Sequence, residues 1–283
     1  MHMKRIGLFT NLSKDVHGTK TSWIVAKANS LGIEILVAPH IYDLIGKGIA
    51  AEENAFFSQS DIVISLGGDG TLLHAACKAA QYNKPIMGIN MGNLGFLTDT
   101  DVAHAEEALL ALKEKRYFIE KRMMLKGIVV RDKIEQLSFF AFNDIGIMKE
   151  LVSRIIHLKA SINGHEINSY SGDGLIVSSP TGSTAYSLSA GGPIVNPSLE
   201  CLILTPICPH SLNARSIITN SNDIVEIEVM SQDRNITLTA DGQAVTTLFA
   251  GDKLLVKKAD IYVELLRTQD QNFFDLLHEK IAI

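Results

Sequence analysis

The stretch DIVISLGGDGTLLHAACKAA, residues 61–80, decides how the first part of the chain folds. Its residues 61–66 form an apolar run typical of a buried strand, and residues 72–80 have the apolar spacing of a helix. The residues between them, Gly67-Gly68-Asp69-Gly70-Thr71, are glycine-rich and few enough to form a tight turn. A buried strand that leads through a tight turn into a helix is the repeating unit of a parallel α/β sheet.

The same alternation continues on both sides of this unit. Strand-like runs and helical spacing alternate at residues 6–9, 21–31, 33–37, 85–90 and 102–115. Strands that are joined through helices pair in parallel. The pattern therefore predicts an α/β N-terminal domain with a parallel sheet, residues 1–121.

Beyond residue 122 the apolar pattern changes to a period of two, which is typical of antiparallel strands. We therefore expect a mostly antiparallel, β-rich C-terminal domain, residues 122–267. One helix is expected within it, over residues 181–190, because helical spacing there follows Pro180 and ends before two glycines and a proline. The last segment, residues 268–283, has helical spacing and can pack back on the first domain.

Composition excludes several classes of protein. The chain has 283 residues, 46% of them apolar and 20% charged, which suits a folded core rather than a disordered tail. Its 26 basic and 31 acidic residues give a net charge of -5 without a basic run, which argues against a nucleic-acid binder. Three cysteines without a CxxC pair argue against a disulfide framework or a zinc site, and no apolar run is long enough to span a membrane. We expect a cytoplasmic protein without nucleic-acid or membrane partners.

The turn at residues 67–71 has the properties of a phosphate-binding loop. It lies at the carboxyl end of a parallel strand, where open α/β sheets bind ligands, and its glycines let backbone N–H groups approach a ligand closely. The helix that follows adds the positive end of its dipole. The turn matches neither the GxxxxGK[ST] loop nor the GxGxxG fingerprint, in which Leu73 stands where the third glycine belongs.

Asp69 is the informative residue of this turn. A carboxylate in a phosphate-binding loop is unfavourable unless it holds Mg²⁺ or accepts the proton of an attacking hydroxyl. The alternative is an ordinary Asp-Gly turn in which Thr71 caps the helix. The flanking glycines, between a strand and a helix, favour the chemical role.

Three further segments have both a chemical and a structural interpretation. Phe96, in the glycine-rich loop 92–97, is either a stacking face for a purine ring or a core residue. Asn143 and Asp144 interrupt an apolar run, and they either recognise ribose hydroxyls and an adenine edge or form a bulge. The hydroxyl groups of residues 181–189 either bind phosphate and ribose oxygens or only cap their own helix.

Together these motifs resemble the NAD kinase family over nearly the whole chain. They follow the order Gly67-Gly68-Asp69-Gly70-Thr71, loop 92–97, Asn143-Asp144, and Asp173-Gly174 leading into residues 180–193. The glycine turn is shared with lipid kinases and, more loosely, with phosphofructokinases, whereas residues 143–144 and 180–193 are far more specific. The resemblance implies the NAD kinase/diacylglycerol kinase-like fold.

The resemblance also implies transfer of the γ-phosphoryl group of ATP, or of polyphosphate, to the 2′-hydroxyl of the adenosine ribose of NAD, giving NADP. Asp69 would be the catalytic residue, and Mg²⁺ or another divalent cation would arrive with ATP rather than at a dedicated protein site. The expected substrate contacts are Gly67, Gly68, Gly70, Thr71, His74, Phe96, Asn143, Asp144, Arg154, Asp173, Thr184, Ala185, Tyr186, Ser187, Leu188, Ser189 and Gln243. Family members are usually homo-oligomers, so a dimer or tetramer is expected.

Two other functions remain open from the residues alone. A lipid kinase of the diacylglycerol or sphingosine type shares the glycine turn but needs an apolar acceptor pocket, which the hydroxyl-rich residues 181–189 do not favour. A non-catalytic NAD-binding regulator has no need of a carboxylate at Asp69. Formation of NADP from ATP, Mg²⁺ and NAD distinguishes the three.

Overall fold

The computed structural model of the chain describes residues 4–92, 95–149, 155–211, 213–232, 236–270 and 272–281. The chain divides into two compact units, unit 1 (Met1–Lys121 with Val263–Ile283) and unit 2 (Arg122–Tyr262). Each unit has a hydrophobic core of its own. None of the helices in the described ranges is long and apolar enough to cross a membrane.

Unit 1 contains a parallel sheet in the order β5-β4-β1-β2-β3. Its strands are β1 (Arg5–Thr10), β2 (Glu34–Val37), β3 (Ile49–Ala50), β4 (Ile62–Gly67) and β5 (Ile86–Asn90), and β6 (Thr100–Asp101) pairs in parallel with β5. β4 is buried along its whole length, with its Leu66 opposite Thr10 of β1 and its Gly67 opposite Asn90 of β5. The expected parallel α/β domain is confirmed, and the carboxyl ends of β1, β4 and β5 meet at one edge.

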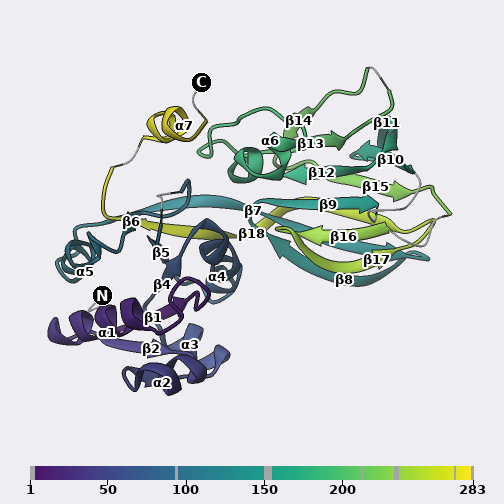
Figure 1. The fold of residues 1–283 in the computed structure, drawn as a ribbon. Helices are drawn as coiled ribbons and strands as arrows, with labels where there is room; N and C mark the ends of the chain where they lie inside the picture. The colour runs from purple at the N-terminus through teal and green to yellow at the C-terminus, as the bar shows by residue number, and fades with distance from the viewer. Residues whose placement is uncertain are drawn as a thin grey trace. The chain divides into compact units, whose positions relative to one another are not determined.

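Helices cover both faces of this sheet (Figure 1). The core side chains of α1 (Thr19–Ser30) and α5 (Ala105–Lys113) pack with Ile6 and Met87 on one face. On the other face lie α3 (Glu53–Gln59) and α4 (Asp69–Gln81), which approach the strands at glycines. A Cβ on Gly7 would lie 2.9 Å from the ring of Phe56, and one on Gly88 would lie 2.5 Å from Leu72. The unit also contains α2 (Pro39–Ile45) and α7 (Phe273–Ile281).

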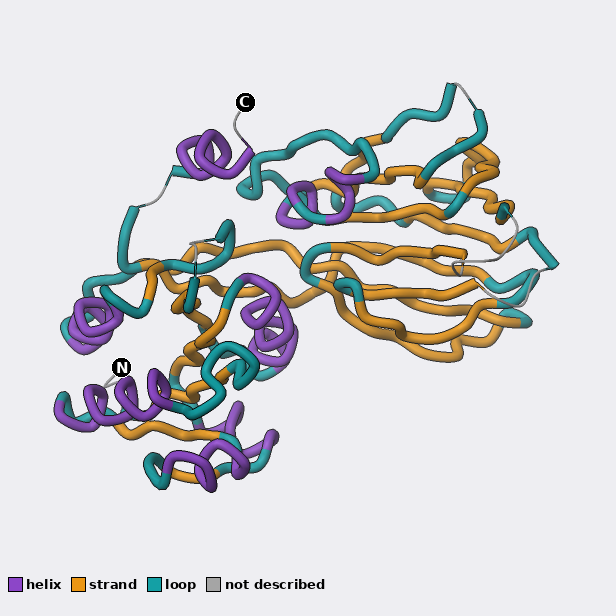
Figure 2. The backbone as a smooth tube through the Cα atoms, viewed as in Figure 1, coloured by secondary structure: helices purple, strands orange, loops and turns teal. Residues whose placement is uncertain are grey.

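Unit 2 consists mainly of strands (Figure 2), and they pair antiparallel, as expected. One sheet, in the order β14-β13-β12-β9-β16-β17, contains β9 (Asp144–Lys149), β12 (Gly174–Ser178), β13 (Cys201–Ile207), β14 (Ile217–Asn220), β16 (Ile236–Ala240) and β17 (Gln243–Leu248). The other strands are β7 (Phe118–Arg131), β8 (Ile134–Ala141), β10 (Ile156–Ile162), β11 (His165–Gly172), β15 (Val225–Val229) and β18 (Lys253–Arg267). β7 and β18 each begin in one unit and end in the other.

The expectation of a single helix over residues 181–190 is wrong. The segment forms a 3₁₀ turn, η1 (Thr181–Thr184), and one helical turn, α6 (Tyr186–Ser189), separated by Ala185 with φ -100° and ψ -133°. The hydroxyl of Ser183 bonds to the carbonyl and the N–H of Val195, at 3.1 and 3.0 Å. Such bonds to other parts of the chain compete with regular helix formation.

Candidate functional site

Gly67 and Gly68 of the turn 67–71 pack against the side chain of Thr71. α4 begins at Asp69 with Gly68 at its N-cap, and the Thr71 hydroxyl accepts the Gly68 N–H at 3.4 Å. Gly67 has to be glycine, because a Cβ there would lie 2.2 Å from the Thr71 Oγ1. Thr71 therefore stabilises the turn from within the first helical turn, and it is not the N-cap residue that the structural alternative required.

The Asp69 carboxylate bonds to the backbone of the loop after β5. Its Oδ2 accepts the N–H of Phe96 at 2.7 Å, and its Oδ1 accepts those of Leu97 and Thr98, each at 3.2 Å. A Cβ on Gly95 would lie 2.1 Å from Oδ1, so glycine is required for this approach. An ionised carboxylate has about four acceptor positions, and these N–H groups occupy three of them. Asp69 thus holds loop 95–98 and keeps one acceptor position for another donor.

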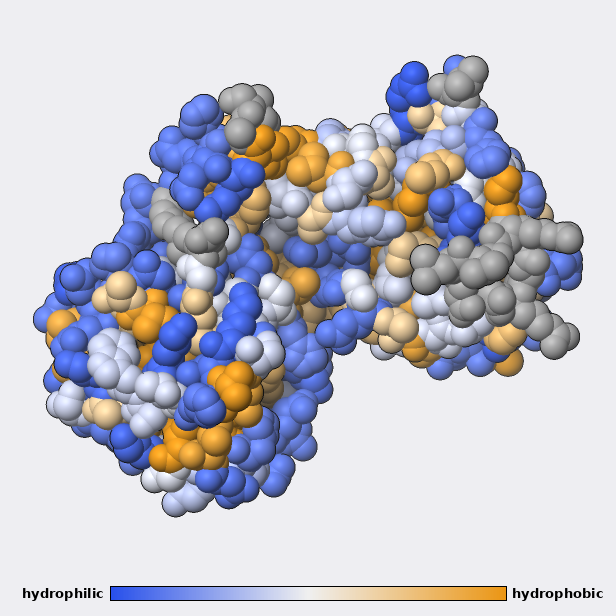
Figure 3. Space-filling model, in the orientation of Figure 1, coloured by the Kyte–Doolittle hydropathy of each residue, from blue (hydrophilic) through white to orange (hydrophobic). Residues whose placement is uncertain are grey.

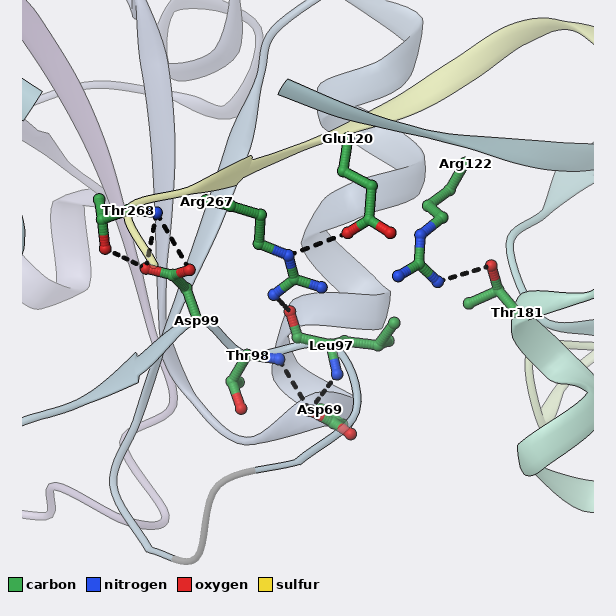
Figure 4. A network of polar contacts seen from close by, with 9 residues as sticks. All are labelled: Asp69, Leu97, Thr98, Asp99, Glu120, Arg122, Thr181, Arg267 and Thr268. Atoms are coloured by element: carbon green, nitrogen blue, oxygen red, sulfur yellow. Dashed lines mark hydrogen bonds and ion pairs between the residues drawn. The ribbon is translucent and has the colours of Figure 1, made fainter. Parts of the chain in front are cut away.

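Buried polar contacts hold the same loop at its carboxyl side (Figure 4). Arg267, only 5% exposed, donates to the Leu97 carbonyl at 3.0 Å and pairs with Glu120 at 3.0 Å. The Asp99 carboxylate accepts the Thr268 N–H at 3.2 Å and the Thr268 hydroxyl at 2.5 Å. Burial raises the pKa of Asp99, against the hydrogen bonds from Thr268. The end of β18 therefore fixes the loop that Asp69 contacts.

Two further expected residues of unit 1 lie on α4 and on loop 95–98. His74 is exposed on α4, with its ring 5.7 Å from that of Phe9. Phe96 is half-buried, and its ring centroid lies 6.4 Å from that of Phe273 on α7. The ring of Phe96 therefore keeps part of its surface accessible to a ligand.

In unit 2, Asn143 and Asp144 lie at the turn into β9 and are held there by Asp241. The Asp241 carboxylate accepts the N–H groups of Phe142 at 2.9 Å, Asn143 at 2.7 Å and Asp144 at 3.2 Å. Asp144 is 5% exposed, and burial, with a further contribution from the charge of Asp241, raises its pKa to about 7. The Asn143 Oδ1 is buried without a hydrogen-bond partner among the described residues.

The segment 180–189 lies directly against this turn. A Cβ on Gly182 would be 2.1 Å from the Asn143 carbonyl oxygen, and the Ser179 hydroxyl donates to the Phe142 carbonyl at 2.6 Å. The hydroxyl of Ser187 is buried against Thr205 at 3.1 Å, so this serine packs within the protein. Thr184, Ala185 and Leu188 are half-buried, whereas Tyr186 and Ser189 are exposed.

Tyr186, Asp173, Gln243 and Arg154 are the remaining expected residues of unit 2. Partial burial of the Tyr186 phenol, followed by the charges of Cys208, Asp144 and Asp173, raises its pKa, while the residue as a whole is 43% exposed. Asp173 pairs with Lys149 at 2.8 Å. Gln243 is exposed at the start of β17. Arg154 lies outside the described residues.

Three residues that contact or hold parts of the candidate site were not predicted from the sequence. Asn11 and Lys14, in the loop after β1, lie beside the glycine turn, and Asp241 holds residues 142–144. The position of Asn11 and Lys14 after a strand that neighbours β4 in a parallel sheet was a usable signal, because such strands end at the same edge. The sequence Asp241-Gly242 indicates a β-turn but does not indicate that Asp241 bonds to residues 142–144.

The chain matches two family models, ATP-NAD kinase N-terminal domain over residues 22–117 and ATP-NAD kinase C-terminal domain over residues 142–268. An NAD kinase from Caldanaerobacter subterraneus subsp. tengcongensis is 40% identical over 99% of this chain and 99% of its own length. One from Acetivibrio thermocellus is 40% identical over 99% and 97%, and one from Heliobacterium modesticaldum is 46% identical over 79% of each.

Two crystal structures share the fold. Yeast NADH kinase complexed with NADH superimposes with a TM-score of 0.93 at 22% identity, covering 100% of this chain and 89% of that one. An NAD kinase from Archaeoglobus fulgidus in complex with ATP superimposes with a TM-score of 0.76 at 24% identity, covering 98% of each chain. These matches confirm the fold that the motifs implied.

The raised pKa of Asp144 gives the protein a specific pH dependence. The folded carboxyl titrates near pH 7 and the unfolded one near pH 4, so stability is lost as the pH rises between these values. Asp144→Asn cannot ionise, and its free energy of unfolding relative to wild type is expected to rise by about 2–3 kcal/mol from pH 5 to pH 8. Urea denaturation at several pH values measures this difference. A difference that stays constant with pH would contradict the assignment.

Arg267 is expected to stabilise unit 1 far more than an exposed arginine does. Arg267→Gln removes a buried ion pair with Glu120 and a bond to the Leu97 carbonyl, and should lower the free energy of unfolding by about 1–3 kcal/mol. The control is Arg5→Gln, whose pair with Glu34 is exposed and should contribute less than about 1 kcal/mol. Equal effects of the two changes in urea denaturation would refute the role of Arg267.

Proposed function

The chain belongs to the NAD kinase family, and on that premise we propose how its residues transfer a phosphoryl group from ATP to NAD. As a member of this family the protein is a phosphotransferase that makes NADP. Membership decides against a lipid kinase and against a non-catalytic regulator. The main support for the proposed mechanism is the position of the Asp69 carboxylate, which is hydrogen-bonded to loop 95–98.

Asp69 accepts the proton of the attacking 2′-hydroxyl of the adenosine ribose. Three of its acceptor positions are taken by the N–H groups of residues 96–98, which fix the orientation of the carboxylate. The remaining position accepts the hydroxyl of the substrate. Phosphoryl transfer depends mainly on such positioning and on neutralisation of phosphate charge, and little on covalent chemistry by the protein.

The phosphates of the donor bind at the glycine turn. The N–H groups in the first turn of α4, among them that of Gly70, suit phosphate oxygens, and Gly67 and Gly68 allow a close approach to the turn. A divalent cation such as Mg²⁺, carried by the triphosphate, neutralises further charge on the transferred group. The ATP complex of the Archaeoglobus fulgidus relative supports ATP as the donor.

The acceptor dinucleotide binds through unit 2. The Asn143 Oδ1, which has no hydrogen-bond partner among the described residues, and the Asp144 carboxyl accept hydrogen bonds from ribose hydroxyls or from an adenine amino group. Thr184, Ala185, Tyr186, Leu188 and Ser189, which keep exposed surface, line the rest of the dinucleotide. Asp173 and Gln243 are assigned to the same ligand, and the NADH complex of the yeast relative supports a dinucleotide at this fold.

We also expect the protein to form a homo-oligomer. Apolar side chains remain exposed in unit 1 near α2, and Figure 3 shows apolar colouring over this part of the unit. Among them Tyr42, Leu44 and Ile49 are 40%, 44% and 42% exposed. Light scattering at several protein concentrations tests the expectation.

The proposed role of Asp69 predicts a loss of turnover without a loss of NAD binding. Asp69→Asn removes the proton acceptor and is expected to lower kcat by about 10²–10⁴-fold. NADP formation from ATP, Mg²⁺ and NAD measures kcat, and calorimetry measures NAD affinity. An Asn variant that binds NAD and turns over at the wild-type rate would remove Asp69 from the role of base.

The approach of Gly95 to Asp69 allows an independent test that leaves the carboxylate in the chain. Gly95→Ala puts a Cβ where the Asp69 carboxylate lies, so the carboxylate has to move and kcat should fall at least tenfold. Gly92→Ala in the same loop is the control, because among the described residues the nearest atom to its Cβ would be Asn90 Oδ1, at 3.8 Å. If both alanines behave alike, the position of the Asp69 carboxylate does not matter for catalysis.

A further inference from the structure

The order of the strands in unit 1 shows where the connections that follow neighbouring strands leave in opposite directions, which is between β1 and β4. β4, which follows β3 in the chain, pairs with β1 on the side opposite to β2. The loop after β1 leads into α1 on one face of the sheet, whereas the turn after β4 leads into α4 on the other face. Open α/β sheets bind ligands where neighbouring strands diverge in this way. The loop at residues 11–18 and the glycine turn 67–71 therefore lie side by side at this point of the sheet edge.

Hydrogen bonds fix the first half of loop 11–18 against the glycine turn. The Asn11 N–H donates to the Leu66 carbonyl at 3.0 Å, and the Asn11 side-chain amide donates to the Thr71 hydroxyl at 3.1 Å. The Asn11 Oδ1 accepts the Ser13 N–H at 2.9 Å, and the Lys14 N–H donates to the Asn11 carbonyl at 3.1 Å. Through these bonds Asn11 holds both Thr71 and the backbone of Lys14.

The second half of the loop is held by Asp15, whose charge is directed to α1. Its carboxylate accepts the N–H groups of Lys20 at 3.2 Å and Thr21 at 2.8 Å, and the Thr21 hydroxyl at 2.7 Å. Although burial opposes it, this set of hydrogen bonds lowers the pKa of Asp15. The acid next to Lys14 in the sequence is therefore bound to the helix start.

The ammonium group of Lys14 lies on the glycine turn. Its Nζ is 3.0 Å from the point where a Cβ on Gly68 would stand. Within the part of the chain that the structure describes, no carboxylate forms an ion pair with Lys14. The one carboxylate of the turn, Asp69, accepts N–H groups of residues 96–98 instead.

We propose that Lys14 binds the phosphates of the nucleoside triphosphate donor at the glycine turn, through a charge-assisted hydrogen bond from its Nζ. This inference rests on the proposed function. It explains how a chain with a net charge of -5, whose glycine turn carries no lysine of its own, attracts a polyanion locally. Lys14 comes from the neighbouring loop, in contrast to the lysine that a GxxxxGK[ST] loop provides from within.

The substitution Lys14→Gln tests the proposal through a difference between the two substrates. A charge-assisted hydrogen bond contributes about 1.5–3 kcal/mol, so KM for ATP should rise about 10–100-fold while KM for NAD stays within about twofold. Lys14→Arg keeps the charge and should recover part of the ATP affinity. The control is Lys4→Gln, which removes the same charge beside the amino end of β1, at the opposite edge of the sheet.

A binding measurement with inorganic tripolyphosphate separates this inference from the proposed function. Wild type and Lys4→Gln should bind tripolyphosphate in calorimetry, and Lys14→Gln should bind it at least tenfold more weakly. If wild type makes NADP and Lys14→Gln keeps wild-type affinity for ATP and tripolyphosphate, the inference fails and the proposed function stands. Equal rises in both KM values with a lower unfolding midpoint would assign Lys14 a structural role and overturn the inference. If wild type makes no NADP, the proposed function itself fails.

Discussion

The contact between the Asp69 carboxylate and the N–H groups of Phe96, Leu97 and Thr98 is the constraint on which the site in unit 1 depends. It joins the turn after β4 to the loop after β5, so the ends of two neighbouring parallel strands are held together at one edge of the sheet. Gly95 is required because no other residue lets the carboxylate come so close. In the proposed mechanism the contact leaves Asp69 a single acceptor position for the substrate hydroxyl.

The two units each fix a turn by the same kind of contact. In unit 1 the carboxylate of Asp69 organises loop 95–98, and in unit 2 the carboxylate of Asp241 organises residues 142–144. Each carboxylate accepts several backbone N–H groups and so fixes a turn that contains residues of the proposed site. The acidic composition of the chain is compatible with the proposed binding of polyanions, because these two carboxylates bond to the backbone, and the groups proposed to bind phosphate are N–H groups and Lys14.

Elements with a local sequence pattern were predicted correctly, whereas features that depend on hydrogen bonds between distant residues were not. The apolar run before Gly67 and the helical spacing after Thr71 are local, and they predicted β4, the turn and α4. The bonds from Asp241 to residues 142–144 span almost a hundred residues and leave no periodic trace. The helix expected over residues 181–190 failed for the same reason, because Ser183 bonds to Val195 and Gly182 packs on the backbone of Asn143. Helices α2 and α3 were missed because seven residues are too few to show a helical period.

In the proposed mechanism Asp69 holds loop 95–98 and the reacting hydroxyl at the same time. A crystal structure of the protein with NAD and a non-hydrolysable ATP analogue would show both contacts. We expect the 2′-oxygen of the adenosine ribose to lie about 2.6–3.2 Å from an Asp69 carboxylate oxygen while the N–H bonds from residues 96–98 persist. A carboxylate that has left loop 95–98, or a 2′-oxygen bound to another side chain, would contradict it.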